Sequence, residues 1–186
     1  MLGLKVISGI LKGRKIEGFD LEGTRPTMDR VKESLFATIQ NYIPDSIVLD
    51  SFAGSGNLGI EAISNGSRVA YLNDISDKAI KVIRKNVSNF KIEDSVTILN
   101  MDYKKCLAYL SHENISFDII FLDPPYKKLI VGDIIKFICE KKLLKDDGLI
   151  VCEVNDNYLG EYETLEKIKE KKYGDKQIII FKNCCK

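Results

Sequence analysis

The chain has 186 residues, of which 45% are hydrophobic and 30% charged, enough for one domain with a substantial core and too few for two large domains. Its 28 basic residues nearly balance its 27 acidic ones, which excludes a globally basic nucleic-acid binder of the histone kind. The sequence contains no apolar run of membrane length and no secretory signal pattern, so we expect no membrane association.

Basic residues are distributed unevenly along the chain. Residues 1–16 carry Lys5, Lys12, Arg14 and Lys15 but no acid, and the stretch from Lys167 onward is rich in lysine. Such clusters can form a phosphate-facing patch on a neutral protein. From charge alone we favour the simpler interpretation, a solvated face.

Cysteine and histidine usage argues against disulfides and metal sites. The five cysteines are odd in number and form no C-x-x-C pair, which is typical of a reducing compartment and predicts a cytoplasmic protein. The single histidine, His112, lies in a polar stretch, so we expect an exposed loop residue and no metal ligand. The cysteines are Cys106, Cys139, Cys152, Cys184 and Cys185.

The first elements of the chain predict an N-terminal extension. Two short alternating runs, 4–8 and 13–16, surround glycines and indicate a hairpin. A loop over 23–27 then leads into a helix for which Thr27 or Asp29 is a possible N-cap. The apolar residues of this helix share one face and are Val31, Leu35, Phe36 and Ile39.

From Ser46 onward strands and helices alternate, which predicts a doubly wound α/β sheet with right-handed crossovers. We expect strands at 47–49, 69–72, 96–99, 117–122 and 149–152, and helices at 57–65, 77–90, 103–110 and 129–143. The tail contains two further predicted strands around a turn at Gly174-Asp175, with no helix between them. These strands, 163–172 and 177–181, should therefore pair antiparallel at the edge of the sheet.

A glycine-rich segment follows the first sheet strand and opens a helix. Gly54, Gly56 and Gly59 fit G-x-G-x-x-G, a pattern shared by NAD, FAD and methyltransferase folds. Asp50 stands four residues before Gly54, where a carboxylate would repel a pyrophosphate but attract the ammonium and sulfonium groups of S-adenosylmethionine. No Gly-Lys-Ser/Thr follows, which argues against a P-loop.

Acidic residues close three successive strands. An acid in the place of Asp74 hydrogen-bonds ribose hydroxyls, and Asp102 could meet the adenine amino group. Any one of these acids could instead be a helix N-cap or a turn residue, but three together favour a cofactor site. The predicted cofactor-binding residues are Asp50, Phe52, Ala53, Gly54, Gly56, Asp74 and Asp102.

The sequence Asp123-Pro124-Pro125-Tyr126 directly follows the most apolar strand, and we predict that it is a catalytic loop. Prolines fix φ and donate no N–H, so the loop is stiff and its carbonyls remain available as acceptors. The Asp123 carboxylate and the Pro124 carbonyl could hold both hydrogens of an exocyclic amine and direct its lone pair toward a methyl group. Tyr126 could stack on a base taken out of its helix. The simpler alternative is a surface turn.

With these motifs assembled, the chain resembles the RsmD family of 16S ribosomal RNA guanine-N2 methyltransferases. The segments that carry the resemblance are 9–14, 24–27 with 29–33, 50–56 with 58–62, and 123–126. The last two occur in many methyltransferases, whereas the first two, in this order and spacing, are specific to the family. Asp74 takes the place of the family's second-strand acid, and Asn86 that of an asparagine that we interpret as structural.

The resemblance implies a class I S-adenosylmethionine-dependent, Rossmann-like methyltransferase domain over 46–186 and an extension over 1–45 that covers the RNA and cofactor sites. It implies methyl transfer to N2 of a guanine in 16S ribosomal RNA, in an assembling small subunit, with S-adenosylhomocysteine as product. We expect a monomer. The predicted RNA-binding residues are Lys12, Arg14, Lys15 and Arg25.

Three other functions compete with this one. A DNA adenine-N6 methyltransferase uses a similar loop, usually with Asn in place of Asp123, but commonly needs a target-recognition domain for which the chain has no room. A non-catalytic RNA-binding assembly factor would not need the intact Asp123 and glycines. An NAD-dependent oxidoreductase is disfavoured by Asp50 and by the two prolines.

Overall fold

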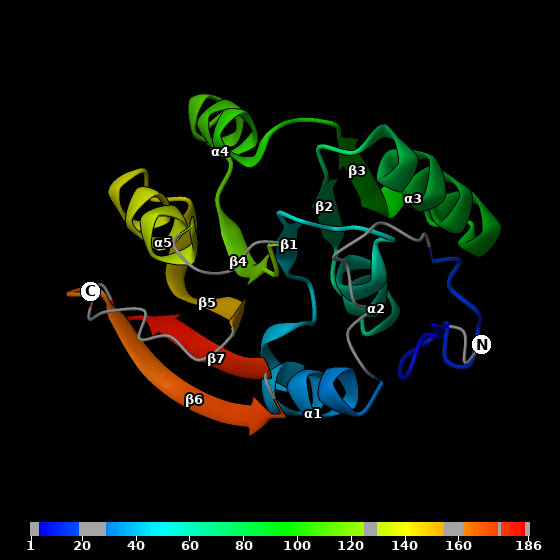
Figure 1. Ribbon diagram of the computed structural model, residues 1–186, viewed down its shortest axis with the longest axis horizontal. Coiled ribbons are helices and arrows are strands. Elements are labelled where there is room, and N and C mark those ends of the chain that lie inside the picture. The colour runs from blue at the N-terminus through cyan, green and yellow to red at the C-terminus, as the bar shows by residue number, and fades with distance from the viewer. Residues whose placement is uncertain (1–3, 19–28, 125–129, 155–161, 175, 185–186) are drawn as a thin grey trace.

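The central sheet has the predicted architecture. The computed structural model describes residues 4–18, 29–124, 130–154, 162–174 and 176–184. Within them seven strands form one sheet in the order β3-β2-β1-β4-β5-β7-β6 (Figure 1). Strands β1 to β5 run parallel, and β7 is antiparallel to both of its neighbours. The strands are β1 Ile47–Asp50, β2 Val69–Asn73, β3 Val96–Leu99, β4 Phe117–Leu122, β5 Leu144–Val154, β6 Leu165–Tyr173 and β7 Lys176–Asn183.

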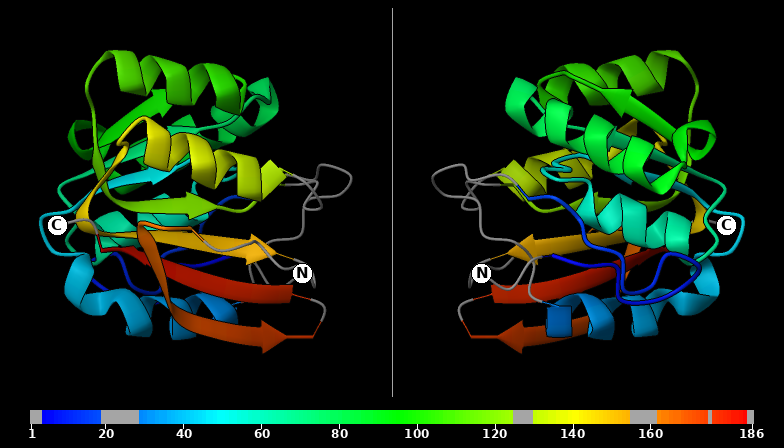
Figure 2. Two further views of the ribbon diagram at one scale, coloured as in Figure 1. Left: turned by 90° about the vertical axis from the view of Figure 1, so that its left-hand side faces the viewer. Right: turned by 90° about the vertical axis from the view of Figure 1, so that its right-hand side faces the viewer.

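Helices cover both faces of the sheet, as Figures 1 and 2 show. The α-helices are α1 Asp29–Ile39, α2 Asn57–Ser64, α3 Asp77–Phe90, α4 Tyr103–His112 and α5 Ile130–Glu140, and the 3-10 helices are η1 Gln40–Tyr42 and η2 Glu93–Ser95. Helices α4 and α5 pack on one face in a single apolar cluster with β4 and β5. Helices α1, α2 and α3 pack on the other face in two further clusters. The result is a three-layer α/β/α arrangement.

The predicted α-helices are present, and where details differ the reasons are local. Residues 4–16 form an antiparallel loop with one bridge, Lys5 to Lys15, instead of two regular strands. Strand β5 begins earlier than predicted because Leu144 pairs with Phe117 before an irregularity in the register. His112 is exposed as expected, but it is the last residue of α4 and not a loop residue.

Among the described residues, no helix combines the length and apolarity that crossing a bilayer requires. Within those same residues, no group of three or more His, Cys, Asp or Glu side chains is arranged to hold a metal ion.

The third glycine of the G-x-G-x-x-G pattern serves helix packing. A Cβ added at Gly59 would lie 2.1 Å from a methyl carbon of Leu72 on β2. A side chain at this position would force Leu72 or the helix to shift, so glycine suits the close approach of α2 to the sheet. The whole of α2 is buried, since the sheet lies on one side of it and the N-terminal segment 4–18 lies beside it (Figure 2).

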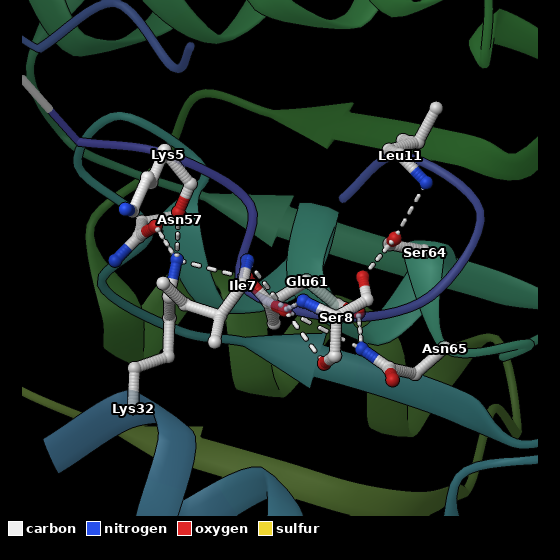
Figure 3. Close-up of polar contacts among 9 residues, drawn as sticks. All are labelled: Lys5, Ile7, Ser8, Leu11, Lys32, Asn57, Glu61, Ser64 and Asn65. Atoms are coloured by element: carbon white, nitrogen blue, oxygen red, sulfur yellow. Dashed lines mark hydrogen bonds and ion pairs between the residues drawn. The ribbon is translucent and has the colours of Figure 1, made fainter. Parts of the chain in front are cut away.

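The N-terminal segment docks onto α2 through a buried polar cluster (Figure 3). The carboxylate of Glu61 accepts backbone hydrogen bonds from Ile7 (2.9 and 3.0 Å) and Ser8 (2.8 Å), and a third from the Ser8 hydroxyl. The Ser64 hydroxyl donates to the Ser8 carbonyl and accepts from the Leu11 N–H at 2.9 Å. At Gly9, φ is +77° and a Cβ would lie 1.8 Å from the Ser64 carbonyl oxygen, so this close approach requires glycine.

Lys32 of α1 completes the cluster. Its ammonium lies 2.8 Å from Glu61, and both side chains are fully buried. The ammonium also donates to the Asn57 side-chain carbonyl (2.7 Å) and to the Lys5 backbone carbonyl (2.6 Å). Desolvation lowers the pKa of Lys32, and the hydrogen bond and charge of Glu61 oppose that shift. One ion pair thus joins α1, α2 and the N-terminal segment.

We expect Lys32→Met to lower the free energy of unfolding by about 3–5 kcal/mol, because it leaves the Glu61 carboxylate buried without its cation. Chemical denaturation at pH 7 measures this. Arg30→Met, at an exposed position of the same helix, is the matched control and should change stability by less than about 0.5 kcal/mol. The double variant Lys32→Met/Glu61→Leu should lose less than the sum of the two single losses. Strict additivity of the two would contradict a coupled pair.

Candidate active site at the carboxyl edge of the sheet

The carboxyl ends of the parallel strands bring four predicted acids to one edge of the sheet. Asp50 is the last residue of β1, and Asp123 comes directly after β4. Asp74 follows β2, and Asp102 follows β3 by three residues. Strand order reverses between β1 and β4, and such a switch point is where open α/β sheets form their ligand crevice.

The glycine loop crosses this edge in a defined conformation. Gly54 and Gly56 have φ of +57° and +81°, which glycine adopts without strain. The Gly54 N–H donates to the Asp74 carboxylate at 2.9 Å, and the Ala53 N–H donates to the Asn73 carbonyl at 2.8 Å. Asp74 therefore holds the loop against β2 while its other carboxylate oxygen accepts from the Ser76 N–H at 2.8 Å.

Asn86 supports the same loop from α3. Its side-chain amide is fully buried and donates to the backbone carbonyls of Ser55 and Glu17, both at 2.9 Å. Its side-chain oxygen accepts from the Glu17 N–H at 2.9 Å. Asn86 thus ties the end of the N-terminal segment to the glycine loop, in agreement with the structural role expected from the sequence.

Asp50 is a buried carboxylate in a crevice of like charges. Burial and the nearby charge of Asp123 raise its pKa to about 7, and Asp74 adds a smaller effect in the same direction. Hydrogen bonds from the backbone N–H groups of Phe52 and Gly59 oppose the shift. A cationic ligand would relieve this repulsion, so the crevice is electrostatically suited to an ammonium or sulfonium group.

Two further predicted residues, Phe52 and Asp102, follow the ends of β1 and β3. The ring of Phe52 packs against Tyr103 with 5.6 Å between centroids, and both side chains are only partly buried. Asp102 caps α4 by accepting from the Lys104 N–H at 2.9 Å. Asp102 is therefore a helix N-cap, the alternative role that the sequence left open for these acids. Its side chain is still partly exposed at the carboxyl edge of the sheet.

Buried polar atoms without partners lie beside the glycine loop. Asn73 donates to the carbonyls of Ser51 (3.1 Å) and Met101 (3.2 Å), which tie the ends of β1, β2 and β3 together. Among the described residues, however, its side-chain oxygen and the Ser51 hydroxyl have no hydrogen-bond partner. Such atoms normally find one. Unsatisfied polar groups beside a desolvated carboxylate fit a crevice built for a polar, cationic cofactor such as S-adenosylmethionine.

The predicted catalytic loop is described in part. Asp123 is half-buried and Pro124 is buried, both at the end of β4. Pro125 and Tyr126 lie outside the described residues. The influence of Asp123 on the pKa of Asp50 places the two carboxylates within electrostatic reach of each other.

The sequence analysis missed Glu153, a buried carboxylate near the end of β5. It shares a hollow with Asp123 whose walls come from α1, α2 and the neighbouring strands. The residues that line it are Leu35, Leu58, Leu122, Asp123, Val151, Glu153 and Ile178. An acid inside an apolar strand, as in Val151-Cys152-Glu153-Val154, is the signal that could have revealed it.

The predicted RNA-binding residues differ in their surroundings. Lys12 and Lys15 are exposed. The Arg14 guanidinium lies 4.6 Å from the centre of the Phe90 ring and donates to the carbonyls of Asn89 and Phe90 at the end of α3. Arg14 therefore also anchors the N-terminal segment. Arg25 lies outside the described residues.

Comparison with known proteins now places the chain. It matches the family described as "Conserved hypothetical protein 95" over residues 4–182. The chain belongs to this family. One relative, ribosomal RNA small subunit methyltransferase D of Haemophilus influenzae, is 34% identical over 185 residues, which cover 97% of this chain and 94% of that protein. The name of this relative is that of a small-subunit ribosomal RNA methyltransferase, the class of enzyme that the resemblance predicted.

The chain also resembles solved structures. The yhhF protein of Escherichia coli superposes with a TM-score of 0.88 at 26% identity, covering 99% of both chains. An RNA methyltransferase of Salinibacter ruber, solved in complex with S-adenosyl-L-homocysteine, has a TM-score of 0.67 at 16% identity and covers 87% of this chain and 95% of that one. The latter likeness concerns the fold alone, which is the class I methyltransferase fold predicted from the sequence.

We expect Asp50→Asn to stabilise the free protein and to abolish cofactor binding. The pKa of Asp50 is raised from its unfolded value of about 4 to about 7, so its ionisation costs stability progressively over that window and fully above it. At pH 8 the variant should gain roughly 4 kcal/mol in the free energy of unfolding, and near pH 4 almost nothing. Denaturation at both pH values measures the difference.

The wild-type protein should bind S-adenosylmethionine more weakly as pH falls below about 7, since Asp50 must lose its proton to face the cation. Calorimetry in buffers of different ionisation enthalpy should detect the released proton. Asp146→Asn, at an exposed position, is the control and should leave both stability and binding unchanged. A pH-independent affinity between pH 6 and 8 would refute this role of Asp50.

Proposed function

We propose that this protein transfers a methyl group from S-adenosylmethionine to the exocyclic N2 amine of a guanine in 16S ribosomal RNA of the small subunit. The observation that carries the proposal is the placement of Asp123 and Pro124 at the end of β4, beside the desolvated Asp50. The name of the Haemophilus influenzae relative supports the substrate, and the ligand of the Salinibacter ruber structure supports the cofactor.

The proposed mechanism depends on which atoms accept hydrogen bonds from the target amine. S-adenosylmethionine, when bound, supplies an electrophilic methyl group on a sulfonium. The Asp123 carboxylate and the Pro124 carbonyl each accept a hydrogen bond from one N–H of the amine, which turns the nitrogen lone pair toward that methyl group. As the N–C bond forms and the S–C bond breaks, the nitrogen becomes cationic, and the Asp123 carboxylate stabilises that charge. The surplus proton leaves to Asp123 or to water.

Other residues are assigned supporting roles in this proposal. Asp50, Phe52, Ala53, Gly54, Gly56, Asp74 and Asp102 hold the cofactor, and Pro125 and Tyr126 complete the catalytic loop. Tyr126 stacks on the target base. Lys12, Arg14, Lys15 and Arg25 contact RNA, within an extension over 1–45 that covers the catalytic domain. We further propose that the protein acts as a monomer in the cytoplasm, where small subunits are assembled.

We expect Asp123→Ala to reduce the rate of methyl transfer by about 10²- to 10³-fold, the loss typical of removing one transition-state contact. Its affinity for S-adenosylmethionine should stay within a few-fold at pH 8. Because Asp123 raises the pKa of Asp50, the pH dependence of binding should also move to lower pH. Single-turnover label transfer and calorimetry measure these quantities, with Asp146→Ala as the control.

The substrate is tested by incubating the protein and methyl-labelled S-adenosylmethionine with undermodified small subunits, protein-free 16S ribosomal RNA or duplex DNA. Nucleoside analysis then identifies the labelled product. The proposal expects N2-methylguanosine in ribosomal RNA. N6-methyladenine in DNA would establish the adenine methyltransferase instead. Binding of RNA without any transfer would favour the non-catalytic assembly factor.

We expect Lys12→Gln with Lys15→Gln to weaken binding to 16S ribosomal RNA and to flatten its salt dependence by about 1.4 in the log–log slope, the value for two phosphate contacts on single strands. Both side chains are exposed, so stability should not change. Fluorescence anisotropy across a salt series measures the slope. An unchanged slope would return these lysines to the solvated-face interpretation.

A further inference from the structure

Two small hollows lie next to each other between Asp123 and the edge strand β6, and they share Leu35 and Ile178 as lining residues. The first contains Asp123 and Glu153 and belongs to the candidate active site. The second lies between α1 and β6 and is lined by Ser34, Thr38, Lys169, Lys171, Tyr173 and Ile180, in addition to the two shared residues. We call the second hollow the α1–β6 groove.

Strand register aligns residues of the two hollows in one row across the sheet. Glu153 of β5 pairs with Ile178 of β7, which pairs with Lys171 of β6. Paired residues point to the same face of a sheet, so a row runs from the active-site acid to a lysine. Leu122 pairs with Cys152, and Asp123 is therefore next to Glu153 at the start of this row. Three strand spacings of about 4.8 Å separate β4 from β6, or roughly 14 Å.

A second row runs parallel to the first, one pleat further from the edge. Val151 pairs with Ile180, which pairs with Lys169. Lys169 and Lys171 therefore project from the same face of β6, about 7 Å apart along the strand. That spacing is comparable to the distance between neighbouring phosphates of a nucleic-acid strand.

The charges in the α1–β6 groove are available to a ligand. Lys169 and Lys171 are exposed, and within the described part of the chain neither forms an ion pair. Lys171 donates to the Ser34 hydroxyl at 3.1 Å and lies 5.0 Å from the centre of the Tyr173 ring. Glu170 alternates to the other face, where it contacts Lys167 and Gln177. The α1–β6 groove is thus cationic where the adjoining hollow is acidic.

We propose that the α1–β6 groove holds the RNA backbone that flanks the target guanine, with Lys169 and Lys171 each contacting a phosphate. This rests on the proposed function, since the groove lies next to the hollow that contains Asp123. Scattered lysines on an edge strand commonly only blunt its aggregation. Here the two cations share a face, line a groove and lie in register with the active-site acids, and these features fit a polyanionic strand that enters the site.

The test is Lys169→Gln with Lys171→Gln in the full-length protein. The control is Lys136→Gln with Lys141→Gln, an exposed lysine of α5 and the exposed residue that directly follows this helix, which covers the opposite face of the sheet. We expect the groove variant to bind protein-free 16S ribosomal RNA about tenfold more weakly and to raise the KM for RNA without changing kcat. The salt slope should fall by about 1.4, while affinity for S-adenosylmethionine and the thermal midpoint stay unchanged.

Each outcome decides the proposal. If the groove variant matches the control in affinity and salt slope, the α1–β6 groove does not bind phosphates and the inference is wrong. A loss seen only with assembled small subunits, and not with protein-free RNA, would mean that the groove recognises a protein, which also overturns it. The proposed function fails separately, if wild-type protein methylates no guanine, because the binding series does not depend on turnover.

Discussion

The buried ion pair between Lys32 and Glu61 is the contact on which the arrangement of α1, α2 and the N-terminal segment 4–18 depends. Taking two charges out of water costs several kcal/mol, and their attraction offsets this only when further hydrogen bonds complete the geometry. Here they do, since Glu61 accepts from the backbone of the N-terminal segment and Lys32 donates to Asn57. Asn57 is the first residue of α2 and follows the glycine loop directly. The same pair therefore positions the N-terminal segment, α1 and the cofactor helix.

Negative charge is the second constraint, and it acts beside the N-terminal end of α2, where the Gly59 N–H faces Asp50. The sheet brings Asp50 and Asp123 together in a desolvated crevice, and no cation among the described residues is paired with Asp50. Such a site is costly to the free protein, because burial penalises the ionised carboxylate. A bound cationic cofactor offsets that cost. The stability lost at Asp50 is the physical reason why a cation, and not a dinucleotide phosphate, fits this glycine loop.

Sequence alone predicted the sheet, because buried parallel strands are continuous apolar runs and the helices between them carry clear periodicity. It also located the acids at strand ends, since their positions depend only on where each strand stops. It could not locate Glu61, Lys32 or Glu153 as partners of distant segments, because their roles depend on packing between elements 20 or more residues apart. Nor could it show that Asp74 accepts hydrogen bonds from both the Gly54 N–H of the glycine loop and the Ser76 N–H of the following turn.

Helix α1 links the two constraints. One side of it carries Lys32 into the buried cluster, and another presents Leu35 to both hollows and Ser34 to Lys171. A shift of α1 would therefore move the N-terminus of α2 and the wall of the α1–β6 groove together. The candidate cofactor site and the proposed RNA path thus share helix α1. In this proposal, contacts between the protein and phosphates away from the target base help to fix that base relative to Asp123.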